Sequence, residues 1–137
     1  MSAVLLDTGP LVAFLDRRDR HHEWAKARWG ELIPPLLTCE SVVSESCFLM
    51  KEVPFGRKGV MELLSRGVIK IAFDLGRETK AVAGLMARYD EVPMSLADAC
   101  LVRMSEQYSD CAVFSIDGDF RLYRRHSRGV IPLISPL

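Results

Sequence analysis

The stretch Val4-Leu5-Leu6-Asp7-Thr8-Gly9 is the segment from which the rest of this chain can be interpreted. The apolar run that begins at Ala3 is too short for a helix and ends at the carboxylate of Asp7. Apolar residues with helical spacing follow at once. A buried strand that ends in Asp and leads into a helix places this Asp at the carboxyl edge of a sheet, where open α/β sheets bind ligands. On Asp7 alone, the ordinary explanation that it ends the strand or caps the helix is favoured, so a functional role depends on other acids reaching the same edge.

Further short apolar segments alternate with helical patterns along the chain. Strands are predicted at 36–39, 68–73, 112–116 and 130–134, and helices at 22–30, 40–50, 56–66, 75–89 and 96–104. Pro132 favours the edge of the sheet for the last strand. This alternation predicts a three-layer α/β/α sandwich around a mainly parallel sheet. We see no domain boundary, so we expect a single domain over residues 1–137.

Composition narrows the class of protein. A chain of 137 residues with 49% hydrophobic and 26% charged residues suits one compact domain. No apolar run approaches the length that spans a bilayer, and the N-terminus has no signal-peptide pattern, so we expect a cytoplasmic protein without membrane contact. The four cysteines form no C-x-x-C pair and the three histidines form no metal signature. Buried, reduced thiols are therefore expected rather than disulfides or zinc ligands.

The formal net charge is zero, so contact with nucleic acid would need a local basic patch. One basic segment near the C-terminus follows the last acidic motif and is a candidate for holding RNA phosphates. Its arginines are Arg121, Arg124, Arg125 and Arg128. A smaller group, Arg17, Arg18 and Arg20, follows the first predicted helix. A solvated face is the ordinary explanation of such runs.

Asp98 is the acid that the sequence explains least well as a surface residue. It interrupts an otherwise apolar run just after Ser95, a natural N-cap. Burying a charge costs several kcal/mol unless it is paired or binds a metal. The helix dipole contributes only about 0.3–1 kcal/mol, which is too little to explain an Asp in this position. A buried salt bridge is possible, but a functional carboxylate is favoured.

Other acids are expected to meet Asp98. Asp117 ends the apolar run 112–116 as Asp7 ends the first strand, and the ends of neighbouring parallel strands share one edge of a sheet. Glu45 could reach this edge from its predicted helix, although a solvent-facing Glu is the alternative. Such carboxylates repel one another unless a cation binds between them. Oxygen ligands suit Mg²⁺ or Mn²⁺, and the chemistry served by such a cluster is phosphoryl transfer.

These motifs resemble the PIN-domain ribonucleases. The resemblance rests on Asp7-Thr8 after the first strand, on Glu45 in the third helix, and on the segments 94–99 and 114–120. Size and order of elements look most like the VapC-like toxins of toxin–antitoxin pairs. The resemblance implies a metal-dependent endoribonuclease that uses Mg²⁺ or Mn²⁺, binds an antitoxin protein and forms a homodimer. The implied catalytic carboxylates are Asp7, Glu45, Asp98 and Asp117, and the implied metal ligands are Asp7, Asp98, Asp117 and Asp119.

Within this set, Asp117 is expected to be the direct ligand because it follows the strand. Asp119 is expected to act through water or to cap the next turn. Thr8 and Ser115 are expected to position water or a ligand.

Two alternatives stay open, a housekeeping RNA-processing nuclease and a non-catalytic scaffold of the same fold. A haloacid-dehalogenase phosphatase is disfavoured because position 9 is Gly rather than a second Asp, and a receiver domain because Asp7 has no acidic neighbour.

Overall fold

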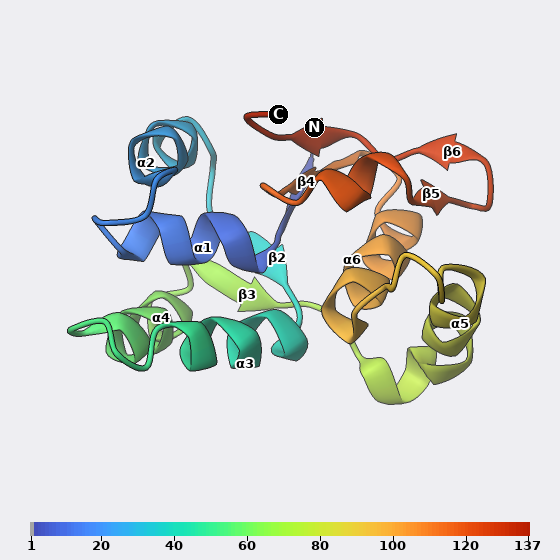
Figure 1. Cartoon of the computed structure of the whole chain (residues 1–137), viewed down its shortest axis with the longest axis horizontal. Helices are drawn as coiled ribbons and strands as arrows, with labels where there is room; N and C mark the ends of the chain where they lie inside the picture. Colours follow the sequence, from blue (N-terminus) through green and yellow to red (C-terminus); the bar gives the residue numbers. More distant parts are fainter. Residues whose placement is uncertain (1) are drawn as a thin grey trace.

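The structure is a computed structural model, and it describes residues 2–137. Short strands and helices alternate through most of the chain (Figure 1). The strands are β1 (Ala3–Leu6), β2 (Leu36–Thr38), β3 (Ile69–Ile71), β4 (Cys111–Phe114), β5 (Arg124–Arg125), β6 (Gly129–Val130) and β7 (Leu133–Ile134). The helices are α1 (Thr8–Leu15), α2 (His22–Gly30), α3 (Glu40–Leu49), α4 (Gly56–Ser65), α5 (Leu75–Arg88), α6 (Leu96–Gln107) and the 3₁₀ helix η1 (Gly118–Arg121).

The main sheet has five strands in the order β3-β2-β1-β4-β7, and every pair in it is parallel. The connections from β1 to β2 and from β2 to β3 lead one way across the sheet, and the connection from β3 to β4 leads back. Right-handed crossovers therefore place α1–α4 on one face and α5–α6 on the other. Figure 1 shows these two groups of helices on opposite sides of the strands. The predicted three-layer α/β/α sandwich is confirmed.

The central strand β1 is buried on both faces, which explains its uninterrupted apolar sequence. Leu5 lies opposite Leu37 on one neighbouring strand and Val113 on the other. On the α1–α2 side, the ring of Trp29 stacks on Phe14 at a centroid distance of 4.1 Å. Hydrophobic burial on both faces thus fixes the register of the strand that ends at the candidate site.

The predicted strand 130–134 is wrong in its extent. Two strands occupy this region, because the chain changes partner on either side of Pro132. β6 pairs with β5 in an antiparallel hairpin, and β7 pairs with β4. Pro132 has no N–H, but its carbonyl accepts a hydrogen bond from the N–H of Val113 at 2.8 Å. The expectation that this segment lies at an edge of the sheet is confirmed, since β7 is an outer strand.

The cysteines lie largely in the interior. Cys39, Cys100 and Cys111 are buried, Cys47 is partly buried, and all four are free thiols. Among residues 2–137 no helix has both the length and the apolar character that crossing a membrane requires.

The central position of β1 leads to a stability prediction. Leu5→Ala removes a fully buried side chain and should lower the free energy of unfolding by about 2–5 kcal/mol. Leu122→Ala makes the same chemical change at a side chain that is 58% exposed and should cost less than about 0.5 kcal/mol. Urea unfolding of both variants checks this. Equal losses would contradict the assignment of β1 as the centre of the core.

Candidate functional site

Asp7 lies where β1 leaves the sheet. Its backbone N–H still donates to the carbonyl of Phe114, and its side chain then caps α1. One carboxylate oxygen, Oδ1, accepts from the N–H of Thr8 at 2.8 Å, and Oδ2 accepts from the hydroxyl of Ser115 at 2.7 Å. Burial raises the pKa of Asp7 to about 7 in spite of these two hydrogen bonds, and the negative charges of Asp98 and Asp117 add to the increase. Without a cation, the carboxyl group of Asp7 therefore stays mostly protonated up to about pH 7.

Ser115 connects the ends of β1 and β4. Its hydroxyl donates to Asp7, and its Oγ accepts from the backbone N–H of Asp117 at 2.9 Å. The hydroxyl thus orients a carboxylate and begins the turn that carries Asp117. The expectation that Ser115 positions water or a ligand stays a prediction.

Asp98 lies in the first turn of α6, where its N–H donates to the N-cap oxygen of Ser95 at 3.0 Å. The side chain is buried, and the hydroxyl of Tyr123 donates to its Oδ2 at 2.7 Å. Burial raises the pKa of Asp98, although the Tyr123 hydrogen bond opposes the change. No ion pair within residues 2–137 includes Asp98. A salt bridge among these residues therefore does not account for the burial of Asp98.

Asp119 lies on η1 and Asp117 immediately precedes this helix, beyond the end of the sheet. The predicted strand 112–116 is too long, since β4 ends at Phe114 and Asp117 does not directly follow a strand. Asp117 caps η1, because its Oδ1 accepts from the N–H of Asp119 at 2.9 Å. The capping role that was considered for Asp119 thus belongs to Asp117. Asp117 is exposed and Asp119 is half-buried.

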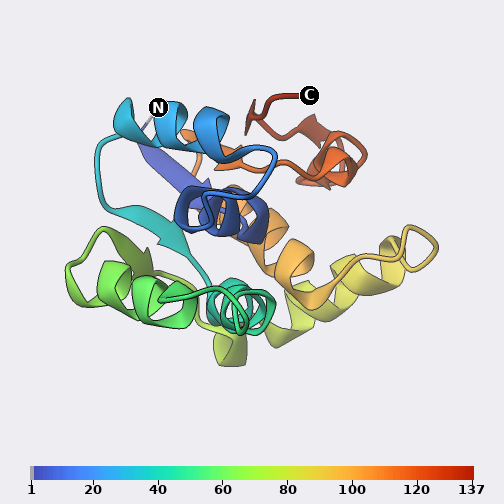
Figure 2. The same ribbon diagram turned by 60° about the vertical axis from the view of Figure 1, so that its left-hand side comes forward.

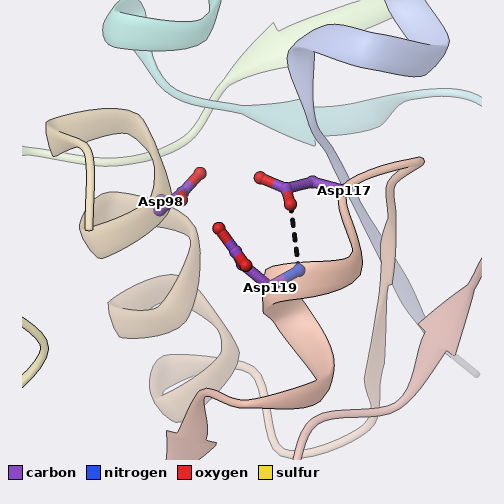
Figure 3. Close-up of side chains that lie close together, drawn as sticks. All are labelled: Asp98, Asp117 and Asp119. Atoms are coloured by element: carbon purple, nitrogen blue, oxygen red, sulfur yellow. Dashed lines mark hydrogen bonds between the residues drawn. The ribbon is translucent and has the colours of Figure 1, made fainter. Parts of the chain in front are cut away.

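Three of the acids form a compact group. Each of Asp98, Asp117 and Asp119 offers one carboxylate oxygen within 4.8 Å of the others, and Figure 3 shows the three side chains converging. This group lies in a cleft of about 390 Å³. Asp7 and Glu45 line the same cleft but lie outside the group of three; Glu45 is exposed on α3. An all-oxygen donor set of this kind fits a hard cation such as Mg²⁺ or Mn²⁺.

Thr8 provides a second observation that fits a polar ligand in the cleft. Its residue lines the cleft, and its Oγ1 is buried without a hydrogen-bond partner in the described part of the chain. A buried hydroxyl without a hydrogen-bond partner destabilises the folded protein, and a hydrogen bond to a ligand or water offsets this cost. The expectation that Thr8 positions water or a ligand stays a prediction.

Tyr123 is a site residue that the sequence alone did not indicate. It is fully buried and packs edge-on against Phe120 and Tyr89, with centroid distances of 5.3 and 5.0 Å. These contacts hold its hydroxyl against Asp98. The available signal was the three-residue spacing of Phe120 and Tyr123, which matches one turn of 3₁₀ helix. The flanking arginines concealed this signal.

The predicted RNA-binding arginines make contacts within the protein. The guanidinium of Arg121 donates to the carbonyl of Leu137, and that of Arg124 donates to two backbone carbonyls of its own segment. Arg125 donates to the carbonyl of Ser105 at 3.1 Å, at the end of α6 opposite to Asp98. Arg128 is exposed. RNA binding by these four residues stays a prediction.

The raised pKa of Asp7 leads to a prediction for the protein in EDTA. Between the unfolded pKa of 3.8 and the folded value of about 7, the folded chain binds more protons than the unfolded chain. The free energy of unfolding should therefore fall as the pH rises through this range, on the order of a few kcal/mol from Asp7. Asp7→Asn should flatten this dependence. Urea unfolding at several pH values measures it, and parallel curves for both proteins would contradict the raised pKa.

Comparisons with known proteins agree with this geometry. The model of the PIN domain family matches residues 4–125. Among solved structures, the chain is similar to VapC20 of Mycobacterium tuberculosis, described as a toxin that cleaves the sarcin-ricin loop. The TM-score is 0.74 at 20% sequence identity, over 85% of this chain and 92% of that one. The search of curated proteins found no match. Because the family model spans most of the chain, from β1 through β5, the chain belongs to the PIN-domain family.

Proposed function

We propose that this protein is a metal-dependent endoribonuclease that hydrolyses RNA phosphodiesters. The observation that carries the proposal is the convergence of Asp98, Asp117 and Asp119 in a cleft that Asp7 and Glu45 also line. The chain belongs to the PIN-domain family, and the similar VapC20 is described as a toxin that cleaves the sarcin-ricin loop. The negative charge gathered in this cleft repels RNA unless a cation is bound, so the geometry is suited to metal-assisted hydrolysis.

The acids that line the cleft have different roles in this proposal. Asp98, Asp117 and Asp119 would hold a Mg²⁺ or Mn²⁺ ion, with Asp7 as a further ligand through oxygen lone pairs that its two hydrogen bonds leave free. A bound ion would supply Lewis acidity, which lowers the pKa of water and offsets charge on the phosphoryl group. Glu45 is exposed and lines the same cleft, and in this proposal it would accept a proton from the attacking water.

The biological role that we propose is that of the toxin in a toxin–antitoxin pair. The similarity to VapC20 over most of both chains supports this role. In this proposal the protein acts in the cytoplasm as a homodimer and as a single domain, and an antitoxin protein binds it and restrains its activity. The substrate is RNA, and which RNA it cleaves is a property of the surface around the cleft rather than of the acids.

Metal dependence is the direct test of the proposal. Mg²⁺ or Mn²⁺ should activate cleavage of a labelled single-stranded RNA and raise the melting temperature, because an ion that binds only the folded state stabilises it. EDTA should abolish cleavage, and added metal should restore it. Cleavage that persists after thorough chelation would exclude the mechanism.

Substitution of Asp98 separates function from stability. Asp98→Asn should abolish cleavage but leave the melting temperature in EDTA unchanged or higher, because it removes a buried charge without an ionic partner. The control is Glu78→Gln, which breaks the 2.6 Å ion pair with Arg103 on the helices α5 and α6. This control should lower the melting temperature and retain cleavage. If Asp98→Asn is the variant that melts early, Asp98 is a structural residue.

A further inference from the structure

The end of α3, the loop 50–55 and the first turn of α4 present aromatic and basic side chains that the proposed chemistry does not use. Phe48 is 64% exposed and Phe55 is 79% exposed, although both are large apolar residues. Lys51, Arg57 and Lys58 line a hollow of about 300 Å³ together with Phe55. We refer to Phe48, Lys51, Phe55, Arg57 and Lys58 as the α3–α4 platform.

The basic side chains of the platform are free to bind a ligand. Within residues 2–137, none of Lys51, Arg57 and Lys58 takes part in an ion pair. The segment 48–58 carries these three basic residues and one acid, Glu52, whereas the whole chain has a net charge of zero. The platform is therefore a local positive surface beside a strongly acidic cleft.

The loop holds Phe55 outward in a fixed conformation. Phe55 has a φ of +61°, which is uncommon for a bulky aromatic residue. Backbone hydrogen bonds from Gly56 to Val53 (2.9 Å) and from Gly59 to Phe55 (2.7 Å) close the turns on both sides. A Cβ on Gly56 would lie 2.8 Å from the carbonyl oxygen of Met50, so only glycine fits there. This tight turn keeps an apolar ring in solvent, which favours contact with a ligand or partner rather than packing within the protein.

The two rings are placed differently. The ammonium of Lys51 lies 4.1 Å from the centroid of the Phe48 ring, which fixes this positive charge over one ring face. No ring contact within residues 2–137 involves Phe55. One ring is therefore free to stack, and the other holds a cation beside it.

The platform is continuous with the cleft. Glu45 and Leu49 line the cleft one helical turn apart on α3, Phe48 immediately precedes Leu49 in the last turn of this helix, and Lys51 follows just beyond its end. One turn of helix rises about 5.4 Å, so the platform begins only about one turn beyond Glu45. Figure 1 and Figure 2 both place the start of α3 near the start of α6, and α3 leads from there to the loop before α4. A strand that leaves the acids along α3 thus meets the platform within a few nucleotides.

We propose that the α3–α4 platform binds single-stranded RNA beside the cleft, with a base stacked on Phe55 and phosphates held by Lys51, Arg57 and Lys58. Free aromatic rings beside basic residues are the usual means of binding single strands with little regard to sequence. This inference deepens the proposed function, since the RNA that it binds is the substrate of the cleft. An apolar protein partner would also cover Phe55, but the unpaired basic side chains favour a polyanion.

Binding of a fluorescent single-stranded RNA of about 12 nucleotides, measured by anisotropy in EDTA, tests this without cleavage. Phe55→Ala should raise Kd about tenfold, and Phe55→Tyr should stay within about twofold of wild type. If Phe55→Ala folds poorly, Phe55→Gly takes its place, because glycine is suited to the left-handed backbone at this position. Phe55→Gly should then show the same rise in Kd of about tenfold. Joint replacement of Arg57 and Lys58 by Gln should reduce the salt dependence of binding by roughly 1.4 units of slope.

Joint replacement of Lys26 and Lys80 by Gln removes equal charge from the exposed surfaces of α2 and α5 and should leave the slope unchanged. An unchanged Kd for Phe55→Ala would overturn the proposal. So would wild-type affinity for Phe55→Leu, since an apolar contact without stacking fits a protein partner instead. If the wild type binds RNA through Phe55 but cleaves none with any metal, the proposed function fails and the platform stands. If the wild type cleaves RNA with metal but its affinity for RNA does not respond to the Phe55 substitutions, the proposed function stands and the platform proposal fails.

Discussion

A carboxylate removed from water at the end of the central strand is the constraint on which this structure depends. Asp7 can be buried there only because a backbone N–H and the Ser115 hydroxyl satisfy its oxygens, and both donors must lie beside the end of β1. This requires α1 to begin at once and β4 to end next to β1. The apolar register of the sheet and the polar geometry of the cleft are therefore fixed together.

Much of this arrangement can be predicted from sequence because it follows from regular periodicity. Short apolar runs that end in acids indicate parallel strands whose ends share an edge. Asp98 was identifiable because burying a charge within an apolar run costs free energy unless the charge is paired or binds a metal. The three-layer sandwich and the meeting of Asp98 with Asp117 follow from these patterns alone.

The details that could not be predicted depend on irregular backbone or on contacts distant in sequence. The 3₁₀ turn of η1 moves Asp117 off the strand and makes it a cap. The hydrogen bond from Tyr123 to Asp98 joins residues 25 positions apart. The break at Pro132 reflects a choice between two partners, β5 and β4, and hydropathy does not distinguish them. The sequence also does not show which arginines of the segment 121–128 hydrogen-bond to backbone carbonyls of the protein and which face solvent.

The burial of α6 has a consequence for how such proteins diverge. Eight residues of this helix are buried, so it cannot move or change composition without repacking the core that carries Asp98. The solvent-facing side chains around the loop from 51 to 55 are bound by no such packing, although the turn itself requires Gly56. Changes of charge or ring at this rim can therefore alter how tightly RNA is held while the helix beneath the acids stays unchanged. Affinity for the substrate can then drift from lineage to lineage over an unaltered hydrolytic centre.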